Sequence, residues 1–246
     1  MIQSNGVLGR IARLPLRFLP PDLVLPIMHG PLRGSNWIVG SAHHACWLGT
    51  YEQEKQKRIA SELKPGSVFY DVGANVGLYS LLAARLDPAG KTYAFEPLPK
   101  NTLYLRRHLD LNCIHNVRVL ELAISDQVGT DSFYEAGDRS MGHLGQDGNL
   151  LVRTATIDSL LHEEEIPPPD YIKMDIEGAE LQALRGGMDC IQRHRPVIFL
   201  ATHGREVHKG CCQLLESWGY ACPLLGAYAD DRGEIIAFFN EARQPT

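Results

Sequence analysis

The chain has 246 residues, of which 44% are hydrophobic and 22% charged, and its formal net charge is −5. This composition excludes a disordered tail and a collagen-like repeat, and no basic stripe typical of general nucleic-acid binders is visible. No apolar run approaches the roughly 20 residues of a membrane-spanning helix, and the six cysteines lack CxxC spacing. We therefore expect a cytoplasmic protein with reduced thiols, with no nucleic-acid partner and no stable membrane insertion.

The first sixty residues differ in character from the rest, and we predict that residues 1–60 form an N-terminal extension or cap. Three arginines between residues 10 and 17 have helical spacing, which fits either a basic amphipathic segment or a solvated face of a packed extension. Residues 35–51 are rich in Trp, His and Gly, which predicts a hairpin or an irregular lid rather than a helix. Residues 52–63 predict a helix, which the sequence Lys-Pro-Gly then ends.

From residue 61 to residue 246 the pattern alternates between strands and helices, as expected for one domain. Short apolar runs predict strands at 68–70, 91–95, 117–122, 171–174 and 196–201. Helical periodicity predicts helices at 77–86, 99–111, 179–193 and 206–218. Because parallel strands need such helical crossovers, the order indicates a doubly wound α/β fold with a mostly parallel sheet covered on both faces.

The remaining segments predict smaller elements around this sheet. Strands are expected at 130–135 and 150–156, on either side of a polar, Gly-rich loop, and Asp158 is expected to cap a short helix. Residues 220–225 and 234–240 are expected to pair around a tight turn, which is too short for a crossover and so adds an antiparallel edge.

The segment after the first predicted strand, Asp-Val-Gly-Ala-Asn-Val-Gly at 71–77, lies where open α/β sheets bind ligands. Its glycines allow a tight turn and a close approach of ligand to backbone. Glu96 ends the next strand, where a carboxylate suits the hydroxyls of a ribose. The spacing GxNxG lacks the pyrophosphate cradle of a dinucleotide site, and the charge of Asp71 suits an ammonium and a sulfonium. These features favour S-adenosylmethionine over NAD as the cofactor.

Five motifs that occur in a fixed order resemble the FkbM family of S-adenosylmethionine-dependent methyltransferases. They are DVGANVG (71–77), AFEP (94–97), LAISD (122–126), TIDSL (156–160) and IKMDIEGAELQALRG (172–186). The resemblance covers about residues 50–226. It implies a Rossmann-like class I methyltransferase fold, with a seven-stranded sheet whose last strand is antiparallel. It also implies O-methylation of a hydroxyl on a sugar or natural-product small molecule.

The resemblance also implies roles for individual residues in binding the cofactor. The methionine end would lie against Asp71, Gly73, Asn75 and Gly77, the ribose against Glu96, and the adenine beside Ala123, Ile124, Ser125 and Asp126. Asp175 belongs to both the cofactor-binding and the catalytic set.

Catalytic candidates lie at the ends of the fourth and fifth main strands. Asp175 and Glu177 follow one strand and His203 follows the next, so the three could form an acid–histidine base or an oxygen/nitrogen metal site. A divalent metal is an open alternative. Glu177 and Glu180 also fit the ordinary preference for acids in the first turn of a helix, and His203 fits an ordinary loop histidine.

Histidine and tryptophan residues of the N-terminal segment are candidates for contacts with the acceptor. His43, His44 and Trp47 could form a lid over a hydroxylated small-molecule acceptor or belong to a packed hairpin, and His143 is a further possible contact. The competing functions are a nucleic-acid methyltransferase, a nicotinamide dehydrogenase and a non-catalytic cofactor-binding protein. The sequence Asp-Ile-Glu-Gly at 175–178 stands where amino-methylating enzymes of nucleic acids carry Asn/Asp-Pro-Pro-aromatic.

Overall fold

The structure is a computed structural model, and it describes residues 19–135, 142–144, 148–163, 165–225 and 232–241. The arginines between residues 10 and 17 lie outside the described residues. Within them, no helix combines the length and the apolar character that crossing a bilayer requires.

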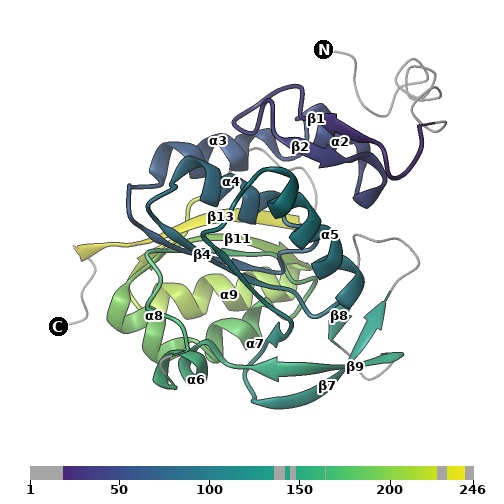
Figure 1. The fold of residues 1–246 in the computed structure, drawn as a ribbon. Coiled ribbons are helices and arrows are strands. Elements are labelled where there is room, and N and C mark those ends of the chain that lie inside the picture. The colour runs from purple at the N-terminus through teal and green to yellow at the C-terminus, as the bar shows by residue number, and fades with distance from the viewer. Residues whose placement is uncertain (1–18, 136–141, 145–147, 164, 226–231, 242–246) are drawn as a thin grey trace.

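A seven-stranded central sheet forms the middle layer of the molecule (Figure 1). Its spatial order is β12 (Tyr220–Ala221), β13 (Arg232–Phe239), β11 (Val197–His203), β10 (Tyr171–Met174), β3 (Val68–Val72), β4 (Lys91–Phe95) and β5 (Val117–Leu120). The strands from β11 to β5 run parallel, and β13 pairs antiparallel with both β11 and β12. The predicted doubly wound sheet with an antiparallel last strand is therefore confirmed.

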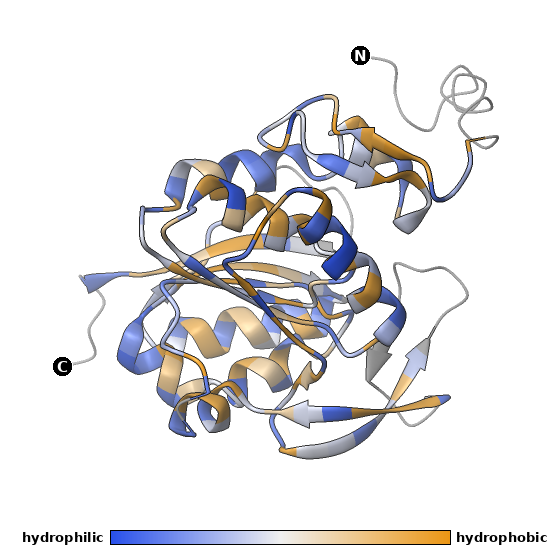
Figure 2. Ribbon diagram, viewed as in Figure 1, coloured by the Kyte–Doolittle hydropathy of each residue, from blue (hydrophilic) through white to orange (hydrophobic). Residues whose placement is uncertain are grey.

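Helices cover both faces of this sheet (Figure 1). One side carries α3 (Gln53–Glu62), α4 (Leu78–Leu86) and α5 (Pro99–Leu111), and the other carries α7 (Glu180–Arg185), α8 (Met188–His194) and α9 (Arg205–Ser217). Neighbouring strand residues point to opposite faces, so Phe69 packs in one core while Tyr70 packs in the other. Because both faces are covered, apolar residues predominate in these strands, and much of the central sheet is orange in Figure 2.

A second, four-stranded sheet lies beside the main one, at the lower right of Figure 1. Its order is β6 (Ala123–Ile124), β9 (Leu150–Ala155), β7 (Gly129–Glu135) and β8 (Gly142–Leu144). The strands predicted at 130–135 and 150–156 are confirmed as β7 and β9. The prediction of a loop throughout 137–149 is wrong at β8, because the chain there pairs antiparallel with β7. Backbone pairing to a neighbouring strand therefore prevailed over a polar composition that favours turns.

The N-terminal segment forms a two-stranded hairpin of β1 (Val24–Pro26) and β2 (Asn36–Ile38), then the 3-10 turn η2 (Val39–Ser41) and α2 (His44–Leu48). Only the second strand of this hairpin falls within 35–51, where a hairpin or an irregular lid was predicted, and the prediction that 35–51 contains no helix is wrong at α2. His43 caps this helix, since its Nδ1 accepts a hydrogen bond from the Ala45 N–H. The hairpin is fixed to α5 by the indole of Trp37, which stacks on the ring of His108 at 3.8 Å between centroids.

Two further predictions are wrong in detail. The helix predicted at 179–193 is two helices, because α7 ends at Gly186, where a Cβ would lie 2.0 Å from the carbonyl oxygen of Ser125. Asp158 does not cap its own helix, α6 (Ile157–His162), whose N-terminus is capped by Thr156. Its carboxylate instead accepts hydrogen bonds from the first turn of α8, at the N–H groups of Asp189 and Cys190.

Candidate functional site

A cavity of about 660 Å³ opens beyond the carboxyl ends of β3, β4 and β10, the position where sheets of this kind bind ligands. Its volume is typical of a site for a small molecule. One part of the lining comes from the loops that follow these strands and from β6, and the other part from the N-terminal segment. The lining residues used below are Gly73, Asn75, Glu96, Ala123, Ile124, Lys173, Asp175 and Glu177 from the former, and His43, Cys46 and Tyr51 from the latter.

The loop after β3 is held by backbone contacts. The N–H groups of Gly73 and Ala74 both donate to the carbonyl oxygen of Phe95, at 3.0 Å. Gly73 has φ +75°, and a Cβ built on it would lie 2.1 Å from the carbonyl oxygen of Asp175. Only glycine combines this conformation with so close an approach. The loop therefore packs directly on the end of β10 and leaves its outer side to the cavity.

Glu96 is buried at the end of β4 and is held by three neighbours. Its carboxylate accepts hydrogen bonds from the Asn75 N–H at 2.8 Å and from the Leu98 N–H and the Asn101 amide at 3.1 Å each. Burial raises the pKa of Glu96, and these hydrogen bonds oppose the shift. A carboxylate has about four acceptor positions, so one position on Oε2 remains for a ligand in the cavity.

Asp71 and Lys173 form a buried ion pair behind the Gly-rich loop. Lys173 Nζ lies 3.2 Å from Asp71 Oδ1 and donates to the carbonyl oxygen of Gly73 at 2.8 Å. The other carboxylate oxygen of Asp71 accepts a hydrogen bond from the Ser80 hydroxyl. Asp71 itself is fully buried and does not line the cavity, whereas Lys173 does. Asp71 therefore does not face the cavity, and its charge is paired with that of Lys173, which does.

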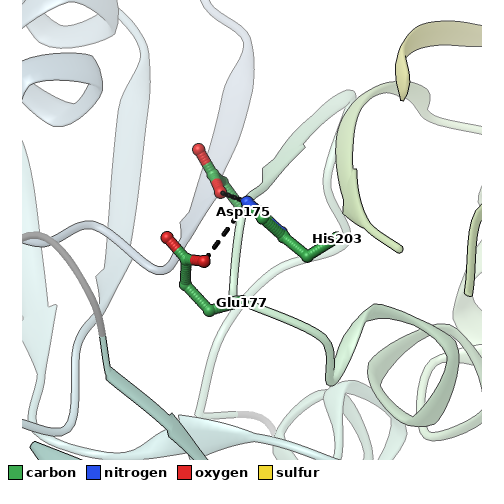
Figure 3. Close-up of side chains that lie close together, drawn as sticks. All are labelled: Asp175, Glu177 and His203. Carbon is green, nitrogen blue, oxygen red and sulfur yellow. Dashed lines mark ion pairs between the residues drawn. The ribbon is translucent and has the colours of Figure 1, made fainter. Parts of the chain in front are cut away.

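The structure brings the three predicted catalytic candidates together, as Figure 3 shows. His203 Nε2 lies 3.6 Å from Asp175 Oδ1 and 3.4 Å from Glu177 Oε2. Asp175 and Glu177 line the cavity, and His203 lies behind them at the end of β11. Glu177 has φ 54°, a left-handed conformation that is uncommon for a residue with a side chain. One ligand atom from each of the three side chains falls within 4.8 Å of the others, so the group could also hold a metal ion.

Glu180, which sequence analysis assigned to an ordinary helix start, orients His203. It is fully buried, accepts hydrogen bonds from the N–H groups of Ile176 and Gly178, and receives the Nδ1–H of His203 at 2.9 Å. This bond directs Nε2 toward Asp175. Burial lowers the pKa of His203, but the hydrogen bond to Glu180 and the nearby carboxylates outweigh it, so the pKa is raised. Glu180 is the second acid of the sequence motif EGAE. The motif alone does not show that this carboxylate contacts a histidine on the next strand.

Lys55 on α3 is a further cation at this site, and no sequence pattern indicated it. Its Nζ lies 2.5 Å from Glu234 Oε1, 2.7 Å from Glu52 Oε2 and 3.9 Å from Asp175 Oδ2. Burial raises the pKa of Asp175, but Lys55, Lys173 and His203 together reverse this, and the pKa is lowered. Asp175 is therefore an ionised carboxylate at the cavity wall.

The other predicted residues fall into two groups. His43 lines the cavity, as do Gly73, Asn75, Glu96, Ala123 and Ile124. His44 and Trp47 do not line it, and the indole N–H of Trp47 donates to His44 Nδ1. Gly77, Ser125 and Asp126 also lie outside the lining. His143 lies in β8, and its side chain is outside the described residues.

Comparisons with known proteins agree with the geometry. Residues 71–222 match the methyltransferase FkbM domain family. Hexuronic acid methyltransferase AglP of Haloferax volcanii is 27% identical to this chain over 161 residues, which cover 65% of this chain and 63% of that protein. The 2-O-methyltransferase NoeI of Sinorhizobium fredii is 27% identical over 175 residues, covering 63% of this chain and 71% of that protein. The chain thus spans somewhat under two thirds of the first relative.

Among solved structures, a methyltransferase FkbM from Methylobacillus flagellatus has the same fold. It aligns with a TM-score of 0.50 at 20% sequence identity, over 80% of this chain and 53% of that one. At this identity, the structural similarity supports the arrangement of the sheet and its helices and nothing beyond the fold.

Proposed function

Since the chain belongs to the FkbM methyltransferase family, we propose that it is an S-adenosylmethionine-dependent O-methyltransferase acting on a hydroxyl of a sugar or natural-product small molecule. Two relatives are named for methylation of a hexuronic acid and of a 2-O position. One observation carries the proposal: a single cavity is lined both by the Gly-rich loop with Glu96 and by the ionised Asp175.

The residues around the Gly-rich loop fit S-adenosylmethionine. Glu96 keeps one acceptor position for a ribose hydroxyl, and Ala123 and Ile124 offer an apolar surface for an adenine. Asp175 and Glu177 place negative charge on the same cavity, which suits a ligand with an ammonium and a sulfonium. When bound, the cofactor would supply an electrophilic methyl group on sulfur.

We assign Asp175 the role of receiving the acceptor proton. An alcohol is a weak nucleophile, and a carboxylate that accepts its hydrogen bond fixes a lone pair toward the methyl carbon. During methyl transfer the acceptor hydroxyl would become strongly acidic, and Asp175 would accept its proton. A carboxylate with a lowered pKa is sufficient for so late a transfer. His203 and Lys55 keep Asp175 ionised before each turnover.

The same three side chains also offer a donor set for a divalent metal. Asp175 and Glu177 would supply carboxylate oxygens and His203 a ring nitrogen. A metal there would supply Lewis-acid activation of the hydroxyl. Incubation with a chelator, followed by readdition of Mg²⁺, Mn²⁺ or Zn²⁺ one at a time, separates the two arrangements: activity that survives chelation assigns the step to Asp175 alone.

A methyl-transfer screen tests the function. The protein is incubated with cofactor labelled in the methyl group and with panels of hydroxylated sugars, polyketides, DNA and RNA. We expect label in a small-molecule ether and none in a Gly73→Arg variant. Transfer to nucleic acid alone would contradict the substrate class, and binding of NADH in place of S-adenosylhomocysteine would contradict the cofactor. Cofactor binding without transfer to any acceptor would favour the non-catalytic alternative.

A further inference from the structure

Lys55 is one of the most deeply buried charged side chains among the described residues, although it lies on a helix of the N-terminal segment. It is 2% exposed, and a buried ammonium is costly unless oppositely charged groups pair with it. Glu52 and Glu234 do so at 2.7 and 2.5 Å. These two carboxylates more than offset the single charge of Lys55, so its burial does not depend on a third.

The ammonium group of Lys55 is also fixed in position. The Tyr79 hydroxyl donates to the same Glu52 oxygen that Lys55 contacts, and the Tyr79 ring lies 5.4 Å from the ammonium. Glu52, the residue that precedes α3, has φ 41°, a conformation that carries backbone strain. The ammonium of Lys55 is therefore held at a fixed position by Glu52, Tyr79 and Glu234.

Asp175 is the third carboxylate near this ammonium, at 3.9 Å, and of the three acids it is the one that lines the cavity. Its two oxygens point to two different cations, Oδ2 to Lys55 and Oδ1 to His203. This arrangement restricts rotation of the carboxylate, because turning it would move one oxygen away from its cation.

We propose that Lys55 is a positioning residue for methyl transfer: together with His203 it holds the Asp175 carboxylate in the orientation that receives the acceptor proton. The inference rests on the proposed function, and it makes α3 part of the catalytic apparatus rather than part of a separate cap. Without Lys55, Asp175 would face the unbalanced charges of Glu52 and Glu234 and would lose one of its two anchors.

The test uses three variants of the full chain. Lys55→Met removes the ammonium that offsets Glu52 and Glu234, so the paired variant Lys55→Met/Glu234→Gln removes one charge of each sign to protect folding. Arg58→Met is the matched control, since Arg58 lies on the same helix, is largely exposed and pairs with Glu62 on the surface. Thermal melting, cofactor calorimetry, kcat, KM and the pH profile of kcat are measured for each.

We expect the paired variant to fold and to bind cofactor as the wild type does, with kcat lowered about 10- to 100-fold by misplacement of the carboxylate. The groups that face Asp175 are Lys55, Lys173, His203, Glu177 and Tyr51. Loss of Lys55 should move the acid limb of the pH profile of kcat to higher pH. Arg58→Met should leave every readout unchanged. A merely structural role would lower the melting temperature without moving the acid limb.

A paired variant with wild-type kcat and an unmoved acid limb would overturn the inference. Should the wild type transfer no methyl group to any acceptor, the proposed function fails and this inference fails with it. An active wild type and an equally active paired variant would leave the proposed function standing and overturn the inference alone.

Discussion

The two walls of the cavity are held in place by different kinds of interaction. On the side of β3 and β4, backbone N–H groups donate most of the hydrogen bonds that hold the wall. Those of Gly73 and Ala74 donate to the carbonyl oxygen of Phe95, and those of Asn75 and Leu98 donate to the carboxylate of Glu96. On the side of β10 and β11, charged side chains hold the wall, with Asp175 between Lys55 and His203.

Because of this difference, we expect the first wall to be sensitive to changes of side-chain size and the second to changes of charge. The backbone-held wall tolerates few changes of side-chain size and contains the ionisable Glu96, whereas the charge-held wall depends on the ionisation of several neighbouring groups. If the comparison is right, substitutions on the first wall alter cofactor binding and those on the second alter turnover. The four predictions below test this, from the largest expected effect to the smallest.

Gly73→Ala should have the largest effect. The new Cβ would lie 2.1 Å from the carbonyl oxygen of Asp175, at a φ of +75°. Overlap and backbone strain together cost about 2–4 kcal/mol, and the loop must move into the cavity. We expect loss of cofactor binding by calorimetry and a lower melting temperature. Gly178→Ala, at another left-handed position with open space around it, is the control for strain alone.

Asp175→Asn should lower kcat about 10²- to 10⁴-fold, the usual contribution of a group that transfers a proton. The amide keeps the shape of the carboxylate and Glu177 keeps its charge, so cofactor affinity should fall much less than kcat. Steady-state kinetics and calorimetry on the same preparation measure both. Asp189→Asn, at an exposed position on α8, controls for the loss of a charge. Wild-type turnover by Asp175→Asn would remove this residue from the mechanism.

Glu96→Gln should weaken cofactor binding about 10- to 100-fold, because a hydrogen bond to a charged acceptor contributes about 1.5–3 kcal/mol. Since Glu96 belongs to the backbone-held wall, kcat at saturating cofactor should change little. Titration with S-adenosylhomocysteine gives the affinity directly. An unchanged affinity would show that the cofactor does not use this carboxylate.

The smallest effect concerns His203 and the dependence of stability on pH. A histidine whose pKa is raised by folding stabilises the native state fully below its unfolded pKa of about 6.5, and this contribution disappears as the pH rises through the folded pKa. His203→Gln should therefore lower the melting temperature more at pH 6 than at pH 9. His194→Gln, at an exposed position, should show no such difference. Equal losses for His203→Gln at both pH values would argue against the charged pair.

The sequence predicted the backbone-held wall well and the charge-held wall only in part. The Gly-rich loop and Glu96 lie 20 to 25 positions apart and follow local rules for strand ends, so spacing alone placed them together. Asp175, Glu177 and His203 were placed correctly because parallel strands end at one edge. Lys55 and Glu234 carried no such signal: they belong to a helix before the sheet and to its antiparallel strand, and their contact depends on three-dimensional packing.

Smaller elements show the same limit. The bounds of α5 and β4 were predicted as observed, because Pro99 starts the helix and a short apolar run marks the strand. It failed at β8 and at the break between α7 and α8, where pairing with β7 and the close approach of Gly186 to Ser125 decide the structure. Contacts between distant segments are not encoded in local composition.

The contact between Lys55 and Glu234 also has a consequence for the order of assembly. β13 is the last described strand in sequence, yet it lies between β11 and β12 in the sheet. A ribosome therefore releases α3, β3 and Asp175 well before Glu234 exists. Until β13 is inserted, the ammonium of Lys55, which lies 3.9 Å from Asp175, lacks its Glu234 partner. Catalytic competence should thus appear late in biogenesis, as a property of the completed sheet rather than of the nascent cofactor loop.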